Sequence, residues 1–179
     1  MGLFDLKEGQ IVLHPDSLAL PPFKRIWNRD KGKGKEKATK EIAYIYYVTD
    51  FKSPYSIYPE DRRKTLVAED FMKDIKYKPD KDVIEAIGFY KKLRETTSMY
   101  VLEKAKSAVY KLADYFDNID FKETDEVGRP IYSAKDVSAN LEKVGKIVES
   151  LDKLEEKVRK EIKTTENIRG GGEIGDYER

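Results

Sequence analysis

Cysteine is absent from this 179-residue chain, and histidine occurs only once. Without cysteine there is no disulfide, no thiol nucleophile and no cysteine-based metal site. The single histidine, His14, stands beside Pro15 and has no fixed serine partner, so we expect no serine triad. The helical zinc motif H-E-x-x-H is missing as well. We therefore expect no catalytic residues, no metal site and no cofactor, and we predict that the protein is not an enzyme.

Two segments that superficially look like ligand sites fail on their spacing. Gly32–Lys35 alternates Gly and Lys, but it does not match the phosphate-loop pattern G-x-x-x-x-G-K-[ST], and no apolar strand precedes it. The acidic residues from Asp114 to Asp125 lack the ligand spacing of a calcium loop and the Gly of its sharp turn. With 34 acidic residues in the chain, no pair of carboxylates is distinguished as catalytic.

Long apolar runs are also missing. The longest, Ile42–Val48, has seven residues, far fewer than the roughly 20 that a membrane-spanning helix needs. The N-terminal MGLFDLKEGQ has neither a charged n-region nor an apolar h-region, so we expect no signal peptide. Leu6 stands where the myristoylation pattern has Ser or Thr. We therefore expect no membrane partner.

Charge is plentiful but balanced. The net charge of +1 gives no overall attraction to nucleic acid. Charged residues make up 39% of the chain, against about 25% in typical domains. The apolar content is modest, yet aromatic residues are abundant and apolar residues are periodic, which disordered chains lack. This composition predicts a helical protein that completes its burial against other proteins.

Apolar periodicity predicts a mainly all-α fold, a helical bundle with a long C-terminal helix. The segment 38–51 is apolar on all sides, so its periodicity also allows a strand; we favour a helix because strong helix formers precede it and no breaker interrupts it. The expected helices are 23–30, 38–51, 59–75, one from Asp80 to an interruption at 96–98, one beyond it through Phe116, and one from Ser133 to Thr165.

The spacing also predicts which side chains face inward. In the third and fourth helices these are Leu66, Val67, Phe71 and Ile75, then Val83, Ile84, Ile87 and Tyr90. In the last two helices, residues spaced alternately by three and four form a packing seam. Its members are Leu102, Ala105, Val109, Leu112 and Phe116, and then Val137, Leu141, Val144, Val148 and Leu151.

We divide the chain into three parts. Residues 1–22 form an extended or hairpin arm, or equally a strand paired on its own domain. Residues 23–165 form the helical domain. Residues 166–179 form a flexible tail, because four glycines interrupt it. Ile174 and Tyr177 are its only side chains suited to anchor in a pocket.

A short basic segment links the first two expected helices. Its lysines, which could contact phosphate or an acidic protein surface, are Lys31, Lys33, Lys35 and Lys37. A solvated loop is the simpler interpretation, and we favour it.

Residues 23–63 contain FKRIWNRDK, a Lys-rich spacer and KEIAYIYYVTDFKSPYSIYPEDRR. This segment, about a quarter of the chain, resembles small virion structural proteins of large tailed phages, in particular the crAss-like group. The resemblance implies a protein of the virion, present in many copies and assembled in the host cytoplasm. Ring and adaptor proteins of head–tail connectors are typically helical bundles with extended arms and tails, a layout that this chain shares.

On this resemblance we predict a ring or adaptor subunit of the head–tail connector. Its partners would be the portal, neighbouring virion proteins and copies of itself in a ring of about twelve. Large aromatic side chains dominate interface energetics, so we predict as interface residues Trp27, Tyr44, Tyr47, Tyr55 and Tyr58, together with Ile174 and Tyr177. The alternatives are an auxiliary or internal capsid protein, a nucleic-acid-binding helical protein, and a regulatory helical module of a host cell.

Overall fold

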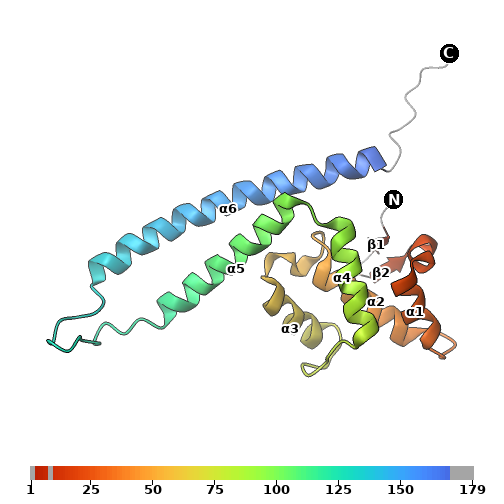
Figure 1. The fold of residues 1–179 in the computed structure, drawn as a ribbon, viewed down its shortest axis with the longest axis horizontal. Coiled ribbons are helices and arrows are strands. Elements are labelled where there is room, and N and C mark those ends of the chain that lie inside the picture. Colours follow the sequence, from red (N-terminus) through yellow and green to blue (C-terminus); the bar gives the residue numbers. More distant parts are fainter. Residues whose placement is uncertain (1–2, 8–9, 170–179) are drawn as a thin grey trace, which may run out of the picture. The chain divides into compact units, whose positions relative to one another are not determined.

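The computed structural model describes residues 3–7 and 10–169 (Figure 1). The fold is mainly all-α, as predicted, with a long C-terminal helix. The chain divides into two compact units. The core unit comprises residues 1–96 and 164–179, and the hairpin unit comprises Thr97–Lys163. The boundary at Thr96 falls inside the 23–165 range for which the sequence predicts a single helical domain.

The N-terminal segment is a hairpin packed on its own unit. Strands β1 (Phe4–Lys7) and β2 (Gln10–Leu13) are antiparallel, with Phe4 opposite Leu13. Phe4 is buried, and its ring makes edge contacts with Phe23 and Tyr90 at centroid distances of 5.4 and 5.1 Å. Of the two interpretations of residues 1–22, the strand paired on its own domain is therefore the one that the structure shows.

Helix α1 (Pro21–Arg29) follows a short 3₁₀ turn, Pro15–Ala19. It begins at Pro21, two residues before the predicted start. Proline suits this position, because the first helical residues have no intrahelical partner for their N–H groups.

Helix α2 (Glu36–Thr49) is the centre of the core unit and confirms the helical interpretation of this apolar run. Nine of its 14 residues are buried, so the helix is covered on nearly all sides. It packs against α1, α3 (Glu60–Asp70) and α4 (Lys81–Arg94). An all-round apolar helix is stable only when neighbours enclose it in this way.

The C-terminal end of α2 is capped by groups from the following loop. The last carbonyl oxygens of a helix have no partner within the helix. Three donors satisfy them: Asp50 N–H bonds Tyr46 O at 2.8 Å, Ser53 Oγ bonds Tyr47 O at 2.8 Å, and Arg63 Nη1 bonds Val48 O at 3.0 Å.

Helix α3 ends at Asp70, before the predicted Ile75. Lys73 takes a left-handed backbone conformation (φ 57°), and the N–H of Met72 bonds back to Val67 O, which closes the helix end. Ile75 lies beyond this end and is exposed, so its predicted inward position is wrong.

Helix α4 starts as predicted, because Asp80 Oδ1 accepts a hydrogen bond from Val83 N–H at 3.1 Å. Val83 and Tyr90 are buried as expected. Ile84 is exposed, and its predicted inward position is wrong: α4 has a narrower buried stripe than the apolar spacing indicates.

The hairpin unit consists of two antiparallel helices that run side by side (Figure 1). The interruption at 96–98 is the start of a new helix, α5 (Thr97–Asp117), and α6 spans Ala134–Arg169. Ser98 Oγ bonds Glu161 Oε1 at 3.1 Å, and Lys106 Nζ lies 3.0 Å from Glu155 Oε2. The partner numbers fall on α6 as they rise on α5, which fixes the antiparallel direction.

The predicted start of α6 is confirmed, whereas its predicted end comes too early in the chain. At the start, Ser133 Oγ accepts from Asp136 N–H at 3.1 Å, which confirms the predicted cap. At the end, the helix continues to Arg169, so residues 166–169 are helical where the sequence predicts tail. Neither proline nor glycine occurs between Thr165 and Arg169. Ile174 and Tyr177 lie outside the described residues.

Candidate interaction surface

Two of the predicted interface aromatics belong to the protein's own core. Tyr44 is 2% exposed and Tyr47 is 6% exposed. Their rings contact Tyr77 and Phe71 at centroid distances of 5.0 and 4.9 Å. Because α2 is enclosed by its neighbours, neither tyrosine presents its ring to a partner, which corrects their prediction as interface anchors.

The other described aromatics of that set are half-buried on the core unit. Trp27 packs against the core from α1. The Tyr55 hydroxyl donates to Asp70 Oδ2 at 3.4 Å. The Tyr58 ring lies 5.8 Å from the Arg62 guanidinium. Trp27, Tyr55 and Tyr58 therefore keep part of their surface for a partner, and their interface role stays a prediction.

The Gly–Lys segment between α1 and α2 is an ordered turn organised by Asp30. The Asp30 carboxylate accepts from the N–H groups of Ala38 at 3.0 Å and Gly32 at 2.8 Å. These hydrogen bonds lower the pKa of Asp30. Lys35 Nζ donates to the Asp30 carbonyl.

Two more of the predicted lysines also have local partners. Lys31 Nζ donates to Asn28 O at 3.3 Å, and Lys37 Nζ lies 3.9 Å from Glu41 Oε1. Lys33 is exposed. Because the segment's own acids and carbonyls hold three of its four lysines, the structure favours the simpler interpretation over a phosphate site.

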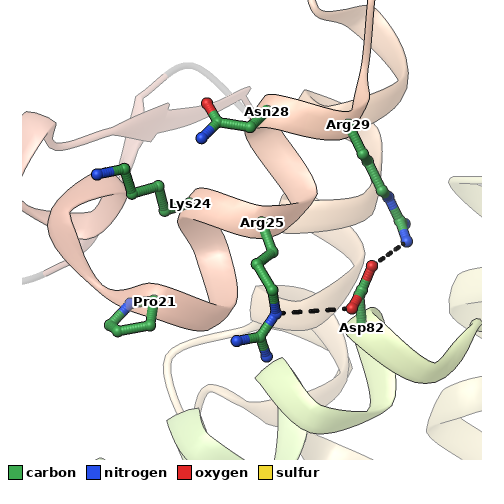
Figure 2. A pocket seen from close by; sticks show the side chains of 6 residues that line it. All are labelled: Pro21, Lys24, Arg25, Asn28, Arg29 and Asp82. Carbon is green, nitrogen blue, oxygen red and sulfur yellow. Dashed lines mark hydrogen bonds and ion pairs between the residues drawn. The ribbon is translucent and has the colours of Figure 1, made fainter.

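A groove of about 500 Å³ lies beside α1 and the start of α4. Figure 2 shows Arg25 and Arg29 both reaching toward Asp82. Arg29 is bound by three carboxylates, with N–O distances of 2.6 Å to Glu41, 2.6 Å to Asp80 and 2.9 Å to Asp82. Burial acts to lower the pKa of Arg29, but Asp80 and Glu41 raise it overall. The charge of the Arg29 guanidinium is thus neutralised by the protein's own carboxylates. The groove is therefore lined by ion pairs that stabilise the fold.

Arg63 is a buried residue that the sequence analysis missed. Its guanidinium donates to four backbone carbonyls: Val48 O at 3.0 Å, Tyr55 O at 3.1 Å, Ser56 O at 3.3 Å and Tyr58 O at 2.8 Å. These bonds fix the loop that carries Tyr55 and Tyr58. Buried arginine is unusual, and nothing in the pattern separates Arg63 from Arg62, so no sequence signal marks it.

Exposed apolar side chains gather on the hairpin unit. On α6 Leu141 is 49% and Val148 is 38% exposed, although both belong to the predicted packing seam. On α5 Val101 is 48% and Tyr115 is 50% exposed. Leu102 and Val158 are fully buried. Helices α5 and α6 therefore bury apolar residues where they meet and leave other apolar side chains exposed beside that contact. We call these exposed side chains the apolar flanks, and the sequence did not predict them.

The described residues contain no group of three His, Asp or Glu side chains placed to hold a metal ion. Within the same residues, no helix has both the length and the apolar character of a membrane span. Comparisons with models of protein families, with curated proteins and with solved structures found no match. The functional argument therefore rests on the residues and their geometry.

Proposed function

We propose that this protein is a structural subunit of a tailed-phage virion, assembled in the host cytoplasm. Within the particle we propose a ring or adaptor subunit of the head–tail connector, which binds the portal, neighbouring tail proteins and copies of itself. The assembly role rests on one observation, the apolar flanks of the hairpin unit. The choice of a virion rests on the resemblance of residues 23–63.

The geometry favours assembly over catalysis. The prominent polar groups of the core unit serve its fold: Arg63 binds carbonyls, Arg29 binds three carboxylates, and Asp50 accepts a hydrogen bond from the Tyr90 hydroxyl. The flanks of α5 and α6, by contrast, leave apolar side chains exposed, among them Leu141 at 49% and Val101 at 48%. Apolar surface that a chain leaves open in this way is typical of protein contacts.

Copy number in the particle tests the proposal. We expect quantitative mass spectrometry of purified virions to find about a dozen copies, as a cyclic ring requires, and cryo-microscopy to place them at the portal vertex. Hundreds of copies on the shell would instead support the capsid alternative. Absence of the protein from virions would refute the proposal.

A second experiment concerns the tail. Deletion of residues 170–179 leaves every described helix intact, so the variant should fold as the wild type does. If the tail threads onto a neighbouring ring, this variant should fail to enter particles. Normal incorporation of the folded variant would remove the tail from the proposal.

A further inference from the structure

The loop that joins α5 to α6 closes one end of the hairpin unit and is exposed along its length (Figure 1). Every residue from 120 to 131 is exposed. Three large apolar side chains lie in this stretch: Phe121 is 55%, Val127 is 76% and Ile131 is 49% exposed. Single exposed apolar side chains are normal on a protein surface, but three of them in one short loop indicate a contact site.

Hydrogen bonds hold this loop in a defined shape. Asp125 Oδ1 accepts from the N–H groups of Val127 at 2.9 Å and Arg129 at 2.8 Å. Asp125 N–H bonds Arg129 O at 2.8 Å, and Ile131 N–H bonds Glu123 O at 3.0 Å. The exposed Val127 is therefore presented by a fixed turn. A loop that is already ordered loses less conformational freedom when it binds a partner.

The same stretch is acidic, and its charges are unpaired. Residues 114–131 contain two basic residues, Lys122 and Arg129. They contain six acidic residues: Asp114, Asp117, Asp120, Glu123, Asp125 and Glu126. The net charge of the stretch is thus −4, and within the described residues none of these charged side chains forms an ion pair. We call residues 114–131 the acidic tip.

The acidic tip differs in this from the rest of the hairpin unit. On α6 the exposed carboxylates of Glu142 and Glu156 pair with Lys146 and Lys160 one turn further along the helix, at 2.9 and 2.7 Å. One more turn on either side of the tip adds Lys111, Lys135 and Asp136, which leaves a net charge of −3. The negative charge is therefore a property of this end of the unit and is not cancelled by its neighbours.

The chemistry of the acidic tip limits what can bind there. In the part of the chain that the structure describes, no three His, Asp or Glu side chains are placed to hold a metal ion, so the carboxylates cover a surface and do not form a cage. A negative surface repels nucleic acid and acidic membranes. It attracts a positively charged protein segment.

We propose that the acidic tip binds a basic segment of a different protein, in which lysines or arginines flank a large apolar side chain. The basic side chains pair with the carboxylates, and the apolar side chain packs against Val127 and Ile131. Ile131 lies opposite Glu123 across the loop, and residues opposite each other in such a pair are neighbours. The tip therefore offers apolar and charged contacts side by side.

A second copy of this chain fits the acidic tip less well. Its exposed basic segment, residues 31–37, reads KGKGKEK and contains no apolar side chain. Lys37 of that segment already lies 3.9 Å from Glu41 Oε1. Two acidic tips would repel each other. The partner is therefore another protein, and this inference does not rest on the proposed role in a virion.

Peptide selection on the purified full-length chain tests the proposal. The probe is a displayed library of random peptides of about twelve residues. We expect the enriched peptides to contain more Lys and Arg than Asp and Glu, and at least one large apolar residue. The enriched peptides are then synthesised, and their binding is measured by fluorescence anisotropy. Raised salt should weaken this binding, because it screens the charges.

Three variants locate the binding on the molecule, and circular dichroism checks that each one folds. The neutralised variant changes three exposed carboxylates of the tip, Asp117→Asn/Glu123→Gln/Glu126→Gln. The matched control changes three exposed carboxylates elsewhere, Glu69→Gln/Glu149→Gln/Asp152→Asn. The apolar variant is Val127→Ser/Ile131→Ser. The neutralised and apolar variants should each bind the selected peptides at least about tenfold more weakly, and the control should bind them as the wild type does.

Four results would overturn the proposal. They are a library that gives no enriched peptide, enriched peptides that are neutral or acidic, peptides that bind the neutralised variant as tightly as the wild type, and self-association of the wild type in sedimentation velocity that the neutralised variant loses. The last result would make a second copy the occupant. Absence of the protein from virions would refute the proposed function but would leave the binding of basic peptides to the tip unaffected.

Discussion

Replacement of Arg63 by Ala should destabilise the core unit more than any change at its neighbour Arg62. The Arg63 guanidinium is buried and donates to four backbone carbonyls. A hydrogen bond to a charged group contributes about 1.5–3 kcal/mol, but burial of the charge offsets much of that sum. Removal of one partner from a buried charged network costs about 3–5 kcal/mol. We expect Arg63→Ala to lower the free energy of unfolding by that amount.

The measurement is urea unfolding followed by tryptophan fluorescence. Trp27 is the only tryptophan and lies in α1, so its signal reports on the core unit alone. Arg63→Lys should recover little, because an ammonium group cannot reach four carbonyls on separate segments.

Arg62→Ala is the matched control. Arg62 is exposed and lies over the Tyr58 ring, a contact that contributes about 0.5–1 kcal/mol at an exposed site. Equal losses for the two alanine variants, or a loss below about 1 kcal/mol for Arg63→Ala, would refute the reasoning that Arg63 holds the loop and the end of α2.

Two further changes test the ion pairs. Burial acts to raise the pKa of Glu60, but Lys64 and Lys91 lower it to about 2. Its stabilising effect should therefore be present above pH 4.5 and be lost as the pH falls toward 2. Because Glu60 is 39% exposed, Glu60→Gln should cost about 1 kcal/mol or less at pH 7 and only a small part of that at pH 2, in urea unfolding at each pH. In the hairpin unit, Lys106→Met should cost about 1–3 kcal/mol by circular dichroism, and Lys106→Met/Glu155→Leu should recover most of that loss, as buried ion pairs replaced by apolar residues do.

The helices could be predicted from the sequence because capping residues and apolar runs mark the same segments that the structure shows as helices. The cap at Asp80, the cap at Ser133 and the apolar run of α2 all act within a few residues along the chain. The errors occur where a distant or backbone effect decides. The left-handed backbone conformation of Lys73 closes the end of α3, and no pattern of side chains in the sequence predicts it. Helix α6 continues past Thr165 to Arg169, because neither proline nor glycine interrupts that stretch.

Surface and core aromatics could not be separated by sequence alone. Tyr44 and Tyr47 lie on the same helix as the core residues Ile42 and Ile45, and an apolar-all-round helix gives no face to distinguish. Their burial depends on how α1, α3 and α4 pack around α2, which is a property of the whole unit. Tyr55 and Tyr58 differ because a loop carries them, and Arg63 holds that loop.

The apolar seam of the hairpin unit shows what periodicity can and cannot specify. A seam spaced by three and four predicts that α6 packs against something, and α5 covers Val158 but leaves Leu141 and Val148 open. One helix covers only part of a stripe that is this wide, so a further surface must complete it. Apolar spacing does not identify that surface, because it records which residues avoid water and not what covers them.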